Sequence, residues 1–435
     1  MTITRAALTM LEQEARALLT RLALVRSFAL HETLVPAAAL ALDAQVAIER
    51  YLSRGRRELR GLVEGYIAWL RSPAARAVPT DVAQRRFSIL RLRFNAVLTQ
   101  FDIFADVITQ RSESRTGVWL AGLDVVAADA LALPGYYEAP PVACYLDRGH
   151  GAAIRRARTR LPGGGENPVA VIRVPRERMV GSGIASSLVH EVGHQGSALL
   201  NLVNSLRPVL RARQRGDARQ RLVWTCWERW ISEIVADLWA VARVGVAATT
   251  GLIGVVSLPR VFVFRLHLDD PHPVPWIRVK LSCAMGRALY PDPQWTRLER
   301  LWEAFYPPLD VPSDLRRILA DLSGTTDDLA RLILSHRPPA LRGRGLGAAL
   351  GAPERHPASL RALYQEWAAR PERMRAAAPA LVFAVMGQAR HDNLLSPEGE
   401  SGLLGELLAA WALRATLDRS ELCARRPARS VAAAV

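Results

Sequence analysis

The sequence predicts an α+β fold that is predominantly α-helical, with one small β-sheet beside a central helix and helical regions on both sides. Apolar residues recur at helical spacing through most of the 435 residues. Two short apolar runs, at residues 141–146 and 169–175, are bounded by glycine or proline and are typical of buried strands. Half of the residues are hydrophobic and 23% are charged, which is the balance of a globular protein with a large core.

Residues 1–138 are expected to form a helical N-terminal region. Apolar and charged residues alternate at helical spacing over residues 6–70. Thr80 or Asp81 could cap the next helix, and helical spacing then continues to Pro134. One face of that helix is expected to carry Phe87, Leu90, Phe94 and Leu98.

Residues 139–293 are expected to form a core region that holds the sheet and the chemistry. An edge strand of this sheet could bind an extended peptide by backbone pairing. After the second strand, one helix is expected to run from residue 181 to residue 207, just before Pro208. A second helix is expected over residues 222–244, and residues 261–264 have the composition of a further strand.

Residues 294–435 are expected to form a helical C-terminal region, interrupted by Pro338-Pro339 and by the glycine-rich residues 343–351. The best membrane candidate, residues 244–259, is shorter than the roughly 20 residues that a spanning helix needs, and it holds three glycines. We therefore expect a buried helix or turn there, with a re-entrant membrane segment as the alternative. Attachment to a membrane is not expected.

The net charge of +16 comes almost entirely from arginine, since Lys280 is the only lysine. The arginine clusters are scattered and are not interleaved with aromatic residues, so they indicate solvated helix faces rather than a base-stacking surface. Weak, non-specific binding to polyanions is still expected. The four cysteines lack Cys-x-x-Cys spacing, and charged residues interrupt the apolar N-terminus. These features predict a cytoplasmic protein without disulfides or a signal peptide, with export by a specialised system as the alternative.

The His-Glu-x-x-His motif at residues 190–194 organises the predicted chemistry. On a helix, His190 and His194 lie on one face and can bind one metal ion, while Glu191 can reach a metal-bound water. The small residues Gly193 and Gly196 permit another segment to approach closely. The alternative is a pair of unrelated core or surface histidines.

A zinc site of this kind needs a third protein ligand. Glu233 is the best candidate, because a carboxylate inside an apolar helix is costly unless a cation neutralises it. Asp237 lies one turn further along the same face and could hold the other nitrogen of His190 or His194. Glu228 is a rival ligand that points away from this face. Buried ion pairs of Glu233 and Asp237 with arginines are the alternative to a metal.

The His-Glu-x-x-His motif followed by Glu-x-x-x-Asp at residues 233–237 resembles the gluzincin zinc metallopeptidases. The block from His272 to Arg278 has the spacing His-Pro-x-x-x-x-Arg and is similar to one in the CAAX prenyl protease and HtpX families. This resemblance covers motifs within residues 169–289, and it implies a zincin-like metallopeptidase core. It also implies that His272 stabilises the oxyanion and that Arg278 braces the carboxylates. The membrane helices of that family have no clear counterpart here.

The implied activity is zinc-dependent hydrolysis of peptide bonds, with one zinc ion held by His190, His194 and Glu233. Zinc would lower the pKa of a bound water, and Glu191 would accept its proton and pass it to the leaving amine. Tyr290 is a further oxyanion candidate, whereas His150 is expected to be a surface residue.

Two other classes of function stay open at this point. One is a binding or scaffold protein that keeps the metal without turnover, and the other is a nucleic-acid-associated protein that uses its arginines. The sequence does not identify the substrate or the oligomeric state.

Overall fold

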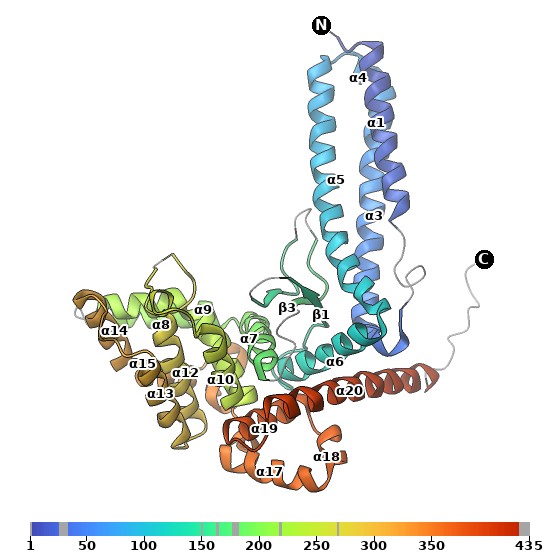
Figure 1. Cartoon of the computed structure of the whole chain (residues 1–435). Helices are drawn as coiled ribbons and strands as arrows, with labels where there is room; N and C mark the ends of the chain where they lie inside the picture. The colour runs from blue at the N-terminus through green and yellow to red at the C-terminus, as the bar shows by residue number, and fades with distance from the viewer. Residues whose placement is uncertain are drawn as a thin grey trace.

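The computed structural model describes residues 2–25, 34–148, 151–161, 165–175, 182–216, 220–267 and 269–425. It is mainly helical and contains a small mixed sheet, which confirms the predicted α+β class. Three long helices form a stalk that projects from a larger helical body (Figure 1). The stalk helices are α1 (Arg5–Leu24), α3 (Leu42–Arg71) and α5 (Thr80–Thr109).

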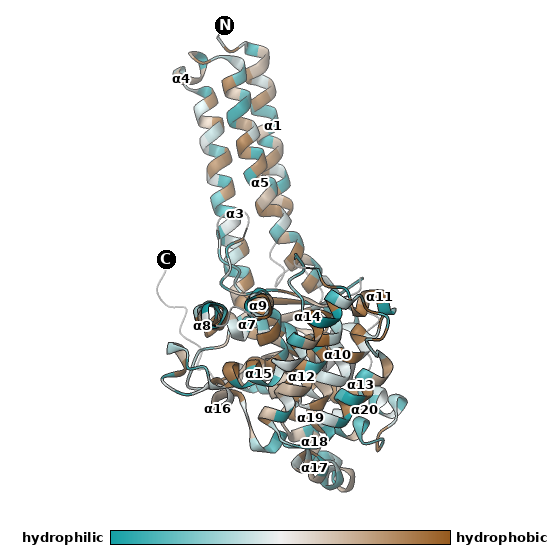
Figure 2. Ribbon diagram, turned by 90° about the vertical axis from the view of Figure 1, so that its left-hand side faces the viewer, coloured by the Kyte–Doolittle hydropathy of each residue, from teal (hydrophilic) through white to brown (hydrophobic). Residues whose placement is uncertain are grey.

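Helical amphipathicity builds the stalk. Hydrophobic and hydrophilic residues alternate along its helices (Figure 2), and the apolar positions meet in a core of their own. Phe87, Leu90 and Phe94 are buried there as predicted, whereas Leu98 is half-buried. The predicted cap is wrong, because α5 already begins at Thr80 and its N-cap position is Pro79. Pro79 has the fixed backbone angle that suits entry into a helix.

The sheet follows α6 (Ser114–Leu131), which ends before Pro134 as predicted. Strands β1 (Val142–Asp147) and β3 (Ala170–Pro175) are parallel neighbours and coincide with the two predicted strands. Strand β2 (Ala153–Arg155) pairs antiparallel with the other side of β3, which gives the order β1-β3-β2. The sequence did not indicate β2, because three residues are too few for a recognisable alternation.

The sheet is buried on both faces. Ala143 and Val171 pack with the residues at the base of the stalk, among them Phe104. Cys144 and Ile172 face the other way, into the core of the body. Because successive side chains of a strand point to opposite faces, a strand buried on both sides needs an unbroken apolar run. This is why β1 and β3 stand out in the sequence.

Side chains cover the outer edge of β1. The Gln110 amide accepts a hydrogen bond from the Leu146 N–H and donates one to the Leu146 carbonyl, both at 2.8 Å. Arg111 donates to the Cys144 carbonyl, and Asp124 accepts from the Cys144 N–H. Arg111 and Asp124 form a buried ion pair at 2.8 Å. The edge of β1 is therefore satisfied within the fold, whereas no described strand pairs with the outer edge of β2.

The body is built around α7 (Ser182–Leu199), α9 (Arg221–Val244), α10 (Val246–Val256) and α12 (Pro275–Leu289). The helix predicted over residues 222–244 is thus confirmed, and residues 244–259 contain α10, which agrees with the expected buried helix or turn. Among the described residues, no helix has the length and apolar character needed to cross a membrane.

Two predictions for the body are wrong. The chain does not form one helix up to residue 207, because α7 ends at Leu199 and α8 (Leu202–Gly216) begins after Asn201. Asn201 has a φ of 52°, a left-handed conformation that asparagine tolerates better than most residues, and Pro208 lies inside α8. The strand expected at residues 261–264 is the short helix α11 (Arg260–Val263) instead. Burial of Val263 and Phe264 outweighs their β-propensity there.

The C-terminal residues are helical, as expected, and return to the body (Figure 1). Helix α19 (Pro379–His391) packs on α10, and α20 (Pro397–Arg425) runs along α6. The division into regions 1–138, 139–293 and 294–435 stays a prediction. The other C-terminal α-helices are α13 (Gln294–Phe305), α14 (Ser313–Gly324), α15 (Thr326–Ser335), α16 (Leu346–Leu350), α17 (Pro357–Ala369) and α18 (Pro371–Ala376).

Candidate metal centre

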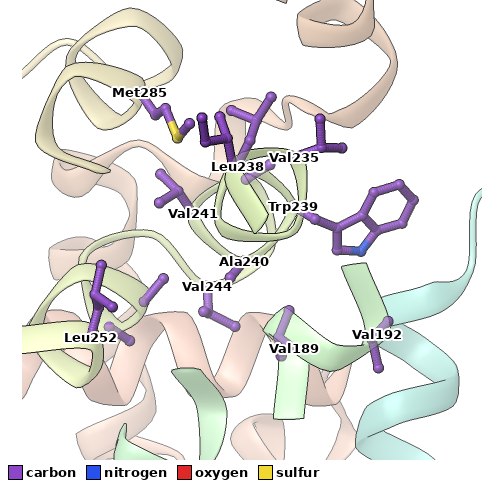
Figure 3. Close-up of a cluster of buried hydrophobic side chains, with 14 of the residues drawn as sticks. Val189, Val192, Val235, Leu238, Trp239, Ala240, Val241, Val244, Leu252 and Met285 are labelled. Carbon is purple, nitrogen blue, oxygen red and sulfur yellow. The ribbon is translucent and has the colours of Figure 1, made fainter. Parts of the chain in front are cut away.

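Close contact between α7 and α9 positions the centre. A Cβ atom at Gly193 would lie 2.8 Å from Trp239 Cβ and 2.9 Å from the Ala236 carbonyl, so only glycine fits. A Cβ at Gly196 would lie 2.5 Å from the Trp239 ring. Figure 3 shows the apolar side of this arrangement, with Trp239 and Ala240 of α9 close to Val189 and Val192 of α7. The predicted role of the two glycines in close packing is confirmed.

Replacing Gly193 by alanine is expected to separate α7 from α9 or to strain both helices. Overpacking of this kind costs about 1–3 kcal/mol, so thermal melts should show a lower unfolding temperature. Gly65→Ala is the matched control, because a Cβ at this position in α3 meets no atom within 4 Å. That change should leave the stability unchanged or raise it by about 0.5–1 kcal/mol. Equal melting behaviour of the two variants would contradict the close-packing role.

The helix contact brings His190, His194 and Glu233 into one group that can hold a metal ion, with one potential ligand atom from each lying within 4.8 Å of the others. His190 Nε2 is 3.2 Å from Glu233 Oε2, and His194 Nε2 is 3.4 Å from Glu233 Oε1. The two imidazole rings are edge to face, 4.8 Å apart. Both Nε2 atoms and the Glu233 carboxylate therefore converge on one point.

Asp237 fixes the orientation of His190 from the far side. Its Oδ1 atom lies 2.8 Å from His190 Nδ1, which leaves Nε2 directed toward Glu233. Arg278 in turn donates from Nε and Nη2 to the two oxygens of Asp237, at 2.7 and 2.8 Å. Burial raises the pKa of Asp237, but the charges of Arg278 and His190 outweigh it and hold that pKa below its usual range. Asp237 is thus a stable carboxylate between two donors.

The two histidines differ in electrostatic environment. Burial lowers the pKa of His190, but the neighbouring Asp237 carboxylate, with help from Glu233, outweighs this effect and raises the pKa to about 9. Burial and the charge of His190 lower the pKa of His194 to about 4. His194 is therefore neutral near pH 7, as a metal ligand must be, whereas His190 must release a proton when a metal binds.

The donor set fits a divalent metal. The Glu233 Oε2 atom is buried and accepts no hydrogen bond among the described residues, although the nitrogens of His190, His272 and Arg278 lie within 3.5 Å of it. A buried carboxylate oxygen with no hydrogen bond is costly, and coordination of a cation removes this cost. Two imidazole nitrogens and one carboxylate oxygen are the protein ligands of many catalytic zinc sites, which keep a further position open.

Glu191 lies beside the ligands without belonging to the group. It lines a cavity of about 150 Å³ together with His190, Asp237, His272 and Arg278. Burial raises the pKa of Glu191 above its ordinary value. A carboxyl group in such a position, with a raised pKa, has the properties of a general base.

His272 reaches the same cavity from the segment before α12. Its Nε2 lies 3.3 Å from Glu233 Oε2, and half of its side chain is exposed. Asp270 holds the residue through Oδ1, which accepts from the His272 backbone N–H and lies 2.8 Å from Nδ1. The sequence did not single out Asp270. Its position two residues before a histidine that precedes proline is the available signal, since aspartate commonly bonds to the backbone two residues on.

Other candidates lie outside the centre. Glu228 forms an ion pair with Arg211 at 2.8 Å, which agrees with its expected direction away from Glu233. The Tyr290 hydroxyl is buried and donates to the Ala242 carbonyl, so it does not face the cavity. His150 lies outside the described residues. Cys144, Cys226 and Cys283 are buried and free.

Asp237→Asn is expected to weaken zinc binding about 10–100-fold, because the partners that orient a metal-binding histidine commonly contribute this much. Competition against a chelating dye measures the dissociation constant directly. Asp392→Asn provides a control, since Asp392 also pairs with an arginine, Arg361, but belongs to a separate polar network. Equal zinc affinity in the wild type and Asp237→Asn would exclude the orienting role.

Comparisons with protein-family models, with curated proteins and with solved structures find no match to this chain.

Proposed function

We propose that the protein is a zinc-dependent metallopeptidase. The observation that carries the proposal is the convergence of His190, His194 and Glu233 on one point, next to a half-buried Glu191 at the wall of a cavity. This arrangement supports one zinc ion, and it leaves Glu191 free for acid–base chemistry. A zinc ion bound there would polarise a substrate carbonyl and acidify a water molecule.

The side chains around the cavity have complementary roles in this proposal. Glu191 accepts a proton from the attacking water and returns it to the leaving amine; its raised pKa makes it a better base at neutral pH. Asp270 orients the half-exposed His272 through Nδ1, and in the protonated form of the ring Nε2 donates to the substrate oxygen on which negative charge develops. Arg278 keeps Asp237 ionised and in place, and Asp237 keeps His190 oriented.

The sheet supports a peptide as the substrate. Gly151 and Ala152, which lead into β2, line the same cavity as Glu191. Gln195 of α7 accepts a hydrogen bond from the Ala157 N–H at 2.8 Å, so the end of β2 is tied to the helix that carries the histidines. An extended peptide that pairs with the outer edge of β2 would run past the centre. The covered edge of β1 offers no equivalent position.

Incubation of the purified protein with a mixture of unstructured peptides, followed by mass spectrometry, tests this function. New peptide termini should form, disappear with a chelator and return when zinc is added. Zinc binding without any cleavage would favour a scaffold protein that keeps the metal.

A nucleic-acid-associated function is the second alternative. Under the metallopeptidase proposal, the dispersed arginines bind DNA or RNA only weakly at physiological salt, with no effect of zinc. Filter binding at several salt concentrations measures this. Tight binding with a steep salt dependence would favour the nucleic-acid alternative instead.

A further inference from the structure

The cavity beside the candidate centre has an apolar wall that the chemistry does not use. This wall is supplied by α10, where Ala248, Leu252 and Val255 lie three or four residues apart and so share one face of the helix. Ala240 of α9 continues it. Leu252 of α10 belongs to the same buried cluster as Ala240 and Val244 of α9 (Figure 3), where the two helices pack together. The same cavity is also lined by His190, Glu191 and His272.

The polar side chains of α12 that line the cavity already have partners, and α10 contributes only apolar side chains to the lining. Ser282 lines the cavity, but its hydroxyl is hydrogen-bonded to that of Thr249 at 2.7 Å. Arg278 also lines the cavity, and it is neutralised by the Asp237 carboxylate. A charged or amide side chain packed against the α10 wall would lose its hydration without gaining a partner from α10 or α12, which is unfavourable.

We propose that this cavity selects an aliphatic or phenyl side chain next to the scissile bond, and that Ala248, Leu252 and Val255 set the size accepted. The proposal rests on the metallopeptidase function. The cavity has a volume of about 150 Å³, and its apolar part is the wall formed by Ala240 and α10. An apolar cavity of about 150 Å³ in another protein accepts benzene, which gives the size of group that such a wall can hold. Leucine, isoleucine, methionine and phenylalanine side chains fit this space, whereas tryptophan exceeds it.

The α10 wall lies in the same small cavity as the general base, Glu191. The cavity therefore selects a substrate residue beside the cleaved bond rather than one further along the peptide. Val255 and Glu191 line one cavity of this small volume, so a side chain in it belongs to a residue that flanks the bond being cleaved. A pocket that discriminates by apolar contact changes the specificity constant by about 10–200-fold per methylene group. This range sets the size of the expected effects.

The test uses the full-length, zinc-loaded protein and peptides that differ only in one residue on either side of the cleaved bond. Wild-type protein is expected to prefer leucine and phenylalanine over alanine, aspartate and lysine by about 10-fold or more in kcat/KM. Ala248→Leu fills the cavity and should reduce the preference for phenylalanine over alanine by a similar factor. Val255→Ala widens it and should improve cleavage next to tryptophan. Zinc content and thermal melts verify that each variant is folded.

Ile253→Ala is the matched control, because Ile253 lies on α10 and does not line the cavity. Its preference among the peptides should equal that of the wild type. If the folded Ala248→Leu and Val255→Ala variants cleaved the peptides with the preferences of the wild type, the specificity role would be wrong. The peptidase function would then still hold. The absence of cleavage by zinc-loaded wild-type protein would overturn both. The Glu191→Gln variant gives a second readout, since it should bind the leucine peptide at least 10-fold more tightly than the aspartate peptide.

Discussion

Glu191→Gln is expected to lower peptide hydrolysis by about 10²–10⁴-fold while the protein keeps one zinc ion, because a positioned general base contributes about this much to the rate. Glutamine has nearly the same size as glutamate but cannot accept the proton from the attacking water. The measurement is kcat/KM on the best peptide found, with elemental analysis of the same sample. Since Glu191 is not among the three ligands, its loss should leave the zinc affinity nearly unchanged.

A suitable control changes a glutamate that lies elsewhere on the body helices. Glu228 is on α9 like Glu233, but it pairs with Arg211 on the surface of the body. Glu228→Gln should retain both zinc and activity. Full hydrolysis by Glu191→Gln would show that another group takes the proton, and the proposed mechanism would then be wrong.

His190→Ala and His194→Ala are expected to lose stoichiometric zinc, because each removes one of the three protein ligands of the site. The variants should also lose the stabilisation that zinc gives the folded state. At a free zinc concentration 100 times the dissociation constant, this stabilisation amounts to about 2.7 kcal/mol. A chelator should therefore lower the unfolding temperature of the wild type and leave that of the two variants unchanged.

His336→Ala serves as the control for histidine removal. His336 Nε2 lies 2.9 Å from the Ser205 hydroxyl and takes no part in the group of three ligands. This variant should retain zinc and respond to the chelator as the wild type does. If His190→Ala kept one zinc ion per chain at wild-type affinity, the assignment of the ligands would be wrong.

Much of the fold could be predicted from the sequence, because a repeating or unbroken pattern of apolar residues there has a single physical cause. The buried faces of the stalk helices follow from helical periodicity, and β1 and β3 follow from apolar runs that a sheet buried on both sides requires. The ligand group followed from similar reasoning. Glu233 lies in an otherwise apolar stretch of its helix, where a carboxylate is costly unless a cation neutralises it, and its spacing from Asp237 places both on one helix face.

The failures have physical causes as well. Strand β2 and the break at Asn201 depend on local geometry that leaves little trace in the composition. Residues 261–264 look like a strand, yet the chain forms a helical turn because it buries Val263 and Phe264 in the body. Asp270 was missed because its role comes from a hydrogen bond to His272 that no motif encodes. The wall of α10 could not be foreseen, because the residues that face the cavity depend on how α10 packs against α7 and α9.

An X-ray crystal structure with anomalous data collected on both sides of the zinc absorption edge tests the central claim most directly. We expect one strong anomalous peak at full occupancy, with His190 Nε2 and His194 Nε2 at about 2.0–2.1 Å from the metal and a Glu233 oxygen at about 2.0–2.2 Å from it. We also expect that Asp237 stays bonded to His190 and does not contact the metal. If a zinc-supplemented crystal showed no peak at this position, or a peak beside other residues, the assignment of His190, His194 and Glu233 as zinc ligands would be wrong.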